Sequence, residues 1–119
     1  MFNSRPALVN NKQLQTYQQS QIMSMEPVPL LIKVYDFIIL HCKKKEAVKA
    51  SKGLVELMSA LNFDYDEVAL GLFRLYQYCQ DKIKLGEYDE AIKILENLRN
   101  AWAESVKREK SAKSEEVPA

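Results

Sequence analysis

The chain has 119 residues, with 17 basic and 16 acidic side chains and a formal net charge of +1. This length fits one small domain and leaves too little room for a two-domain enzyme built on a cofactor-binding fold. The apolar fraction of 47% is enough to form a core. The balanced charge removes the main electrostatic reason to expect nucleic-acid binding.

No apolar run in the chain reaches the 18 residues that a membrane span requires, and the N-terminus lacks the apolar core of a signal peptide. We therefore expect a cytoplasmic protein that does not insert directly into a membrane. In that compartment Cys42 and Cys79 are expected to be free thiols, buried as small core residues.

Two terminal segments are predicted to flank the folded part. Residues 1–26 form a polar, glutamine-rich leader that is long enough for a short helix or cap. Residues 109–119 are charged and rich in small residues, and they are predicted to be a disordered tail.

Between these segments, residues 27–108 contain four stretches with helical periodicity. The first begins near Pro27 or Pro29, because proline is tolerated in the first turn of a helix, and it ends at the lysine triplet 43–45. The others are predicted over residues 46–61, 67–85 and 87–108. Gly86 is suited to ending the third of them. Helices of this length joined by short loops predict an all-α fold, an antiparallel four-helix bundle.

Several apolar residues lie off the main stripe of each predicted helix, and we call them the surplus apolar residues. A bundle helix needs only one apolar face, so such residues either thicken the core or line a surface groove for a partner. Some of them would also fit under neighbouring loops or the leader. They are Ile32, Phe37, Leu40, Val48, Val55, Leu70, Phe73 and Ile94.

The sequence offers no recognisable catalytic chemistry. His41 is the only histidine, and adjacent positions on a helix do not face each other, so it makes no nucleophile pair with Cys42. Neither a cluster of metal ligands nor a glycine-rich phosphate loop is present. We therefore expect no enzyme activity, no metal and no cofactor.

Four short elements occur in an order and spacing that resemble the FliS family, the cytosolic chaperones that bind flagellin before export. The resemblance covers roughly residues 15–104, although Phe37 stands where the family usually has glycine, which leaves room for a divergent member with another client. The first two elements are residues 17–19 (Tyr-Gln-Gln) and Pro27 followed by residues 30–36 (Leu-Leu-Ile-Lys-Val-Tyr-Asp). The third is residues 67–69 (Glu-Val-Ala) followed by 72–78 (Leu-Phe-Arg-Leu-Tyr-Gln-Tyr), and the fourth is Leu95, Leu98, Arg99, Ala101, Trp102 and Glu104.

The resemblance implies a helical bundle in the bacterial cytosol that binds the disordered C-terminal segment of flagellin. Such a chaperone prevents premature polymerisation and delivers its client to the flagellar type III export apparatus. The implied partners are flagellin and a component of the export gate, and the free chain is expected to be a monomer or weak dimer.

Aromatic residues and their neighbours are the predicted partner-binding set, because tyrosine and tryptophan give large, rigid contact areas with a polar group. Tyr35, Tyr76 and Trp102 also lie on core stripes, so a purely structural role stays open for them. The full set is Tyr17, Gln18, Ile32, Tyr35, Tyr76, Tyr78 and Trp102.

Two other functions stay open. One is a non-enzymatic adaptor or self-assembling structural bundle with a different protein client. The other is a regulatory bundle that binds nucleic acid through lysines 43–45 and the basic residues between 107 and 113, although acidic residues interrupt the second cluster.

Overall fold

Each of the four periodic stretches forms a helix in the computed structural model, which describes residues 28–64 and 66–115. Among these residues there is no strand, so the predicted all-α class is confirmed. The predicted leader and residues 116–119 lie outside the described part. The helices are α2 (Val28–Lys43), α3 (Ala47–Ser59), α4 (Asp66–Lys84) and α5 (Tyr88–Glu115).

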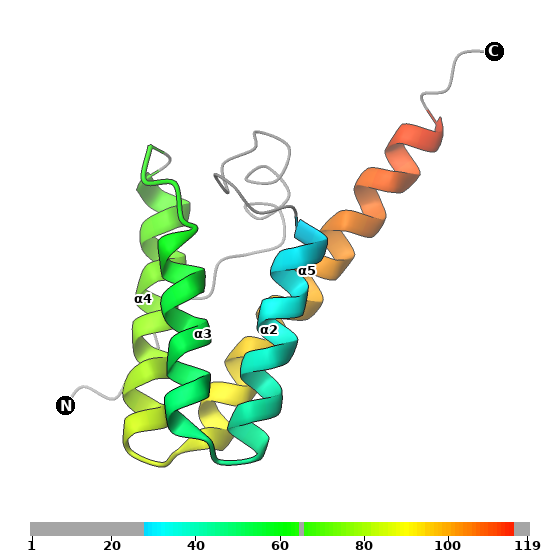
Figure 1. Cartoon of the computed structure of the whole chain (residues 1–119). Helices are drawn as coiled ribbons and strands as arrows, with labels where there is room; N and C mark the ends of the chain where they lie inside the picture. The colour runs from blue at the N-terminus through cyan, green and yellow to red at the C-terminus, as the bar shows by residue number, and fades with distance from the viewer. Residues whose placement is uncertain (1–27, 65, 116–119) are drawn as a thin grey trace.

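The helices form an antiparallel bundle in which each helix packs against two neighbours. The helix α2 lies between α3 and α5, and α4 also contacts both α3 and α5. Figure 1 shows α3 beside α4 and α2 beside α5, with two tight turns at the same end of the bundle. This order follows from the short connections, since a helix joined by a few residues must return along its predecessor.

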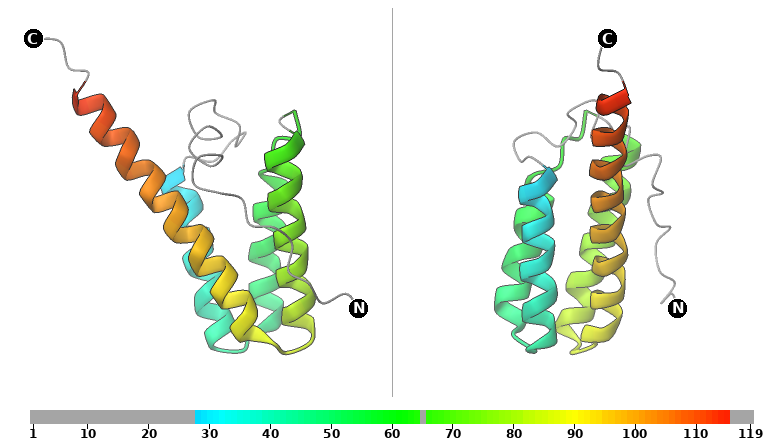
Figure 2. Two further views of the ribbon diagram at one scale, coloured as in Figure 1. Left: turned by 180° about the vertical axis from the view of Figure 1, so that it is seen from behind. Right: turned by 90° about the vertical axis from the view of Figure 1, so that its right-hand side faces the viewer.

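The helix α5 continues well beyond the other helices (Figure 2). The sequence analysis ended this helix near Arg108, but the helix runs to Glu115. Residues 109–115 contain good helix formers and neither glycine nor proline, and the first breaker is Pro118. Just before this extension, an ion pair between Arg108 and Glu104, with 3.5 Å between nitrogen and oxygen, joins two successive turns.

The two turns that share one end of the bundle have the same geometry. Lys45 and Gly86 each adopt a positive φ, of 58° and 76°. The amides of the residues that follow them, Glu46 and Glu87, each donate a hydrogen bond of 2.8 Å to a carbonyl five residues back. This is the Schellman pattern, in which a left-handed residue ends a helix. Glycine is expected there, whereas lysine is a costly choice.

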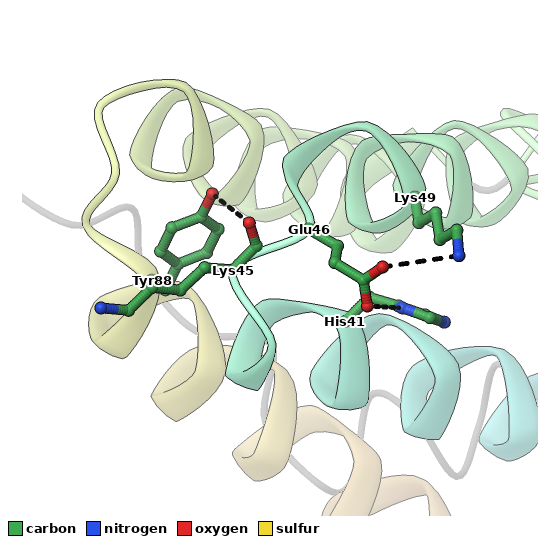
Figure 3. A network of polar contacts seen from close by, with 5 residues as sticks. All are labelled: His41, Lys45, Glu46, Lys49 and Tyr88. Atoms are coloured by element: carbon green, nitrogen blue, oxygen red, sulfur yellow. Dashed lines mark hydrogen bonds and ion pairs between the residues drawn. The ribbon is translucent and has the colours of Figure 1, made fainter.

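A small polar network holds the lysine turn in place (Figure 3). The Tyr88 hydroxyl donates a hydrogen bond of 3.3 Å to the carbonyl of Lys45, which links the two turns. His41 Nδ1 donates to Glu46 at 2.9 Å, and Lys49 lies 3.4 Å from the same carboxylate. The hydrogen bond from His41 is the main reason that the pKa of the Glu46 carboxyl lies below its ordinary value, and the charge of Lys49 adds to it.

The core contains an apolar stripe from every helix, broadly as the periodicity predicted. One surplus apolar residue, Ile94, is fully buried, which corrects its assignment off the stripe. Because α5 contacts both α2 and α4, it buries a wider face than one stripe, and the neighbouring residues Ile94 and Leu95 are both fully buried. Two further surplus residues, Ile32 and Phe73, are half-buried against the core.

Gly53 on α3 lies against the side chain of Ile38 on α2. A Cβ atom at this position would overlap the buried side chain of Ile38 on α2. A glycine inside a helix costs up to about 1 kcal/mol relative to alanine. Here its missing side chain allows two helices to come together.

Candidate partner-binding surface

Three of the predicted partner-binding residues form a hydrogen-bonded group in the core. Tyr35, Tyr76 and Trp102 come from α2, α4 and α5, and each has an exposed fraction of 0%. Trp102 Nε1–H donates to the Tyr35 hydroxyl at 3.0 Å, and the two tyrosine hydroxyls share a hydrogen bond of 2.5 Å. We call these three residues the core triad.

The core triad has no surface to offer to a partner in this conformation. Burial of their polar atoms is tolerated because each finds a partner inside the protein. This burial favours the structural role that their position on core stripes had left open, and their role as contact residues stays a prediction. They join three helices at one level of the bundle.

Ile32 and Tyr78, the other two described residues of the predicted set, are half-buried. Ile32 lies one helical turn before Asp36, whose carboxylate accepts a 2.9 Å bond from Arg99 on α5. Tyr78 has Lys82 Nζ 5.3 Å from its ring centroid, beside the turn that leads into α5. Both residues pack against the edge of the core. Tyr17 and Gln18 lie outside the described residues.

Exposed apolar side chains lie elsewhere, on α3 and on the neighbouring α2. Val48 and Val55 on α3 are 70% and 51% exposed, and Phe37 on α2 is 44% exposed. All three are surplus apolar residues. Large exposed aliphatic and aromatic side chains in neighbouring positions are typical of partner-binding surfaces.

One groove runs along the surface between α2 and α3 and has a volume of about 370 Å³. Its wall includes Phe37, whose ring lies 4.2 Å from the ring of His41, measured between centroids. The polar network of Figure 3 thus reaches the groove, since Glu46 orients His41 and His41 supports Phe37. This α2/α3 groove is lined by Lys33, Val34, Phe37, Lys52, Gly53 and Glu56.

A second groove of about 370 Å³ lies on the other side of α3, against the C-terminal end of α4. The side chain of Gln80 on α4 donates a 3.5 Å hydrogen bond to the carbonyl of Ser51 and ties the two helices together beside it. Lys52 lines both grooves, so α3 forms a ridge between them. This α3/α4 groove is lined by Ala47, Val48, Ser51, Lys52, Val55, Ile83 and Lys84.

The sequence reasoning missed Lys52 and Lys84 as groove residues. The available signal was the alternation of valine and lysine on one face of the second predicted helix, at positions 48, 52 and 55. Ile83 and Lys84 lie about thirty positions after Lys52 in the chain, so only the packing of α3 on α4 brings the groove together.

The described residues include no group of three or more side chains suited to holding a metal ion. Burial raises the pKa of the Cys42 thiol to about 11, so this sulfur stays protonated at neutral pH and is a poor nucleophile. None of the described helices has the length and apolar character needed to span a bilayer.

These features define a class: an all-α bundle with a hydrogen-bonded core and apolar grooves on its outer surface, an arrangement suited to binding another protein. Residues 41–109 match the model of the FliS family, described as flagellar protein FliS. Because the match covers more than half of the chain, the protein belongs to the FliS family. No curated protein and no solved structure matches the chain significantly.

Family membership confirms the resemblance found in the sequence and supports the bundle fold. FliS is a family of flagellar chaperones and not a family of enzymes. The chain therefore has a chaperone role in the flagellar system, with a flagellar protein as its partner.

Proposed function

We propose that this chaperone binds the C-terminal disordered segment of flagellin in the bacterial cytosol, prevents its premature polymerisation and delivers it to the flagellar type III export apparatus. The observation that carries the proposal is the pair of apolar grooves on either side of α3, in a member of a flagellar chaperone family. A segment that forms amphipathic helices only in the filament needs such grooves to bury its apolar side chains beforehand.

The extent of the surface fits the energetics of binding a disordered client. Ordering such a segment costs about 2–5 kcal/mol of the gross interaction energy, so a long contact is needed for useful affinity. The two grooves, Ile32 and Tyr78 together offer apolar contacts on three helices. Under this proposal Tyr17 and Gln18 of the leader add to the contact, and the core triad supports it from inside.

Charge placed in the α3/α4 groove is the direct test of the proposal. The double variant Val48→Asp/Val55→Asp puts two carboxylates on its wall at positions that are mostly exposed. We expect its affinity for a peptide of the flagellin C-terminal segment, measured by calorimetry, to fall by a factor of about ten or more, because apolar contact is lost and carboxylates are desolvated. The melting temperature should change little.

Leu70→Asp is the matched control, since Leu70 is 40% exposed on α4 and does not line either groove. It should bind the peptide as the wild type does. Unchanged affinity of the double variant would contradict the proposal, and so would an absence of binding to the wild-type chain.

Delivery requires a second contact, with a component of the export gate, and the free chain is proposed to be a monomer or weak dimer. Sedimentation over a range of concentrations separates this proposal from a self-assembling bundle. A chaperone stays small and forms a one-to-one complex with the flagellin segment, whereas a structural bundle grows with concentration.

A further inference from the structure

The charged side chains that line the α3/α4 groove are all basic. Its lining residues include two lysines, Lys52 and Lys84, and no carboxylate. Both lysines are exposed, and neither makes an ion pair with a carboxylate that the structure describes. By contrast, Lys43, Lys49 and Lys82 each lie within 3.6 Å of a glutamate.

The residues of α3 that line this groove are placed to meet another helix. Val48, Lys52 and Val55 lie four and then three positions apart, so they share one face of α3. The two valines are about 10 Å apart along the axis, from a rise of about 1.5 Å per residue. A helix lying along α3 would meet an apolar side chain, a cation and a second apolar side chain in turn.

We propose that the α3/α4 groove binds a helix whose apolar face is bordered by carboxylates, and that Lys52 and Lys84 pair with those carboxylates. This inference rests on the proposed function, because the helix with the carboxylate borders is taken to be part of the client segment. The apolar floor supplies affinity, and the two lysines select the charge and orientation of the segment.

The charge pattern disfavours a second copy of this chain as the occupant. In a twofold dimer built on this groove the same patch faces itself, which would bring Lys52 and Lys84 against their own copies with no carboxylate in the lining. A partner with acidic side chains meets no such repulsion.

Two synthetic amphipathic peptides test the inference on the full-length protein. They share one leucine face, and its borders carry glutamate in one peptide and lysine in the other. At low salt we expect the glutamate peptide to bind at least about tenfold more tightly, which corresponds to two partly desolvated ion pairs. Raising the salt concentration should shrink this difference, because exposed charges are screened.

The double variant Lys52→Glu/Lys84→Glu should reverse the preference between the two peptides. Lys93→Glu is the control, since Lys93 is exposed on α5 and does not line this groove. It should keep the wild-type preference. Equal binding of the two peptides to the wild type, or a preference that survives the double variant, would overturn the inference.

The flagellin C-terminal peptide is measured in parallel, so that the two proposals fail separately. If it binds the wild type and the Lys52→Glu/Lys84→Glu variant equally well, the proposed function stands and the charge selection is refuted. If it does not bind the wild type, the proposed function itself fails. A wild-type dimer in sedimentation that the double variant abolishes would assign the groove to self-association and would also overturn the inference.

Discussion

Replacing Trp102 by alanine is expected to lower the free energy of unfolding by about 3–5 kcal/mol, the usual cost of truncating a buried aromatic residue. Trp102 is fully buried, and its indole N–H donates to the Tyr35 hydroxyl at 3.0 Å. The variant therefore creates a cavity and also removes a hydrogen-bond donor from the core. Because small domains are stable by only about 5–15 kcal/mol, this change should bring the bundle close to unfolding.

Urea denaturation followed by circular dichroism measures the effect, since Trp102 is the only tryptophan and fluorescence would be lost with it. The variant Trp102→Phe separates the two causes, because it keeps most of the ring volume but cannot donate to Tyr35. We expect the lost hydrogen bond to cost about 0.5–1.5 kcal/mol. The Tyr35 hydroxyl keeps its bond to the Tyr76 hydroxyl, so it is not left unsatisfied. An unfolding free energy unchanged by Trp102→Ala would contradict the role of the core triad.

Gly53→Ala is expected to destabilise the protein, although alanine is the better helix former. Alanine in place of a helical glycine contributes up to about 1 kcal/mol. Against this gain, the new methyl group would overlap Ile38 in a fully packed region, and overpacking costs about 1–3 kcal/mol. The net loss should appear as a lower urea midpoint.

A double-mutant cycle with Ile38→Ala identifies the cause. If the overlap with Ile38 is responsible, Gly53→Ala should cost much less, or even stabilise, in the Ile38→Ala background. A stabilising effect of Gly53→Ala in the wild-type background would show that α3 and α2 are further apart than described. The same methyl group would make the α2/α3 groove shallower, because Gly53 lines it.

The helix positions could be predicted from the sequence because the apolar periodicity and the helix-breaking residues indicate the same boundaries. Pro27 and Pro29 restrict the start of α2, and Gly86 ends α4, so the predicted boundaries there lie within about two residues of the observed ones. The turn after α2 has no such marker. Lys45 occupies the left-handed position, and its local signal was only a run of lysines.

The candidate surface was predicted less completely than the fold. The surplus apolar residues did indicate exposed apolar surface, and Phe37, Val48 and Val55 are indeed exposed. Their assembly into two grooves depends on which helices become neighbours, which local patterns do not contain. For the same reason the sequence left open whether Tyr35, Tyr76 and Trp102 belong to the core or to the surface.

The proposed function requires that spare apolar surface around α3 holds a flagellar client. Hydrogen exchange of the free chain and of its complex with the flagellin C-terminal segment tests it most directly, because amide protection is measured along the whole chain. We expect new protection in α3 around Val48 and Val55, with the segments of the core triad, including α2 around Tyr35, already protected in the free protein. Unchanged exchange in α3 on binding of the segment would contradict the claim.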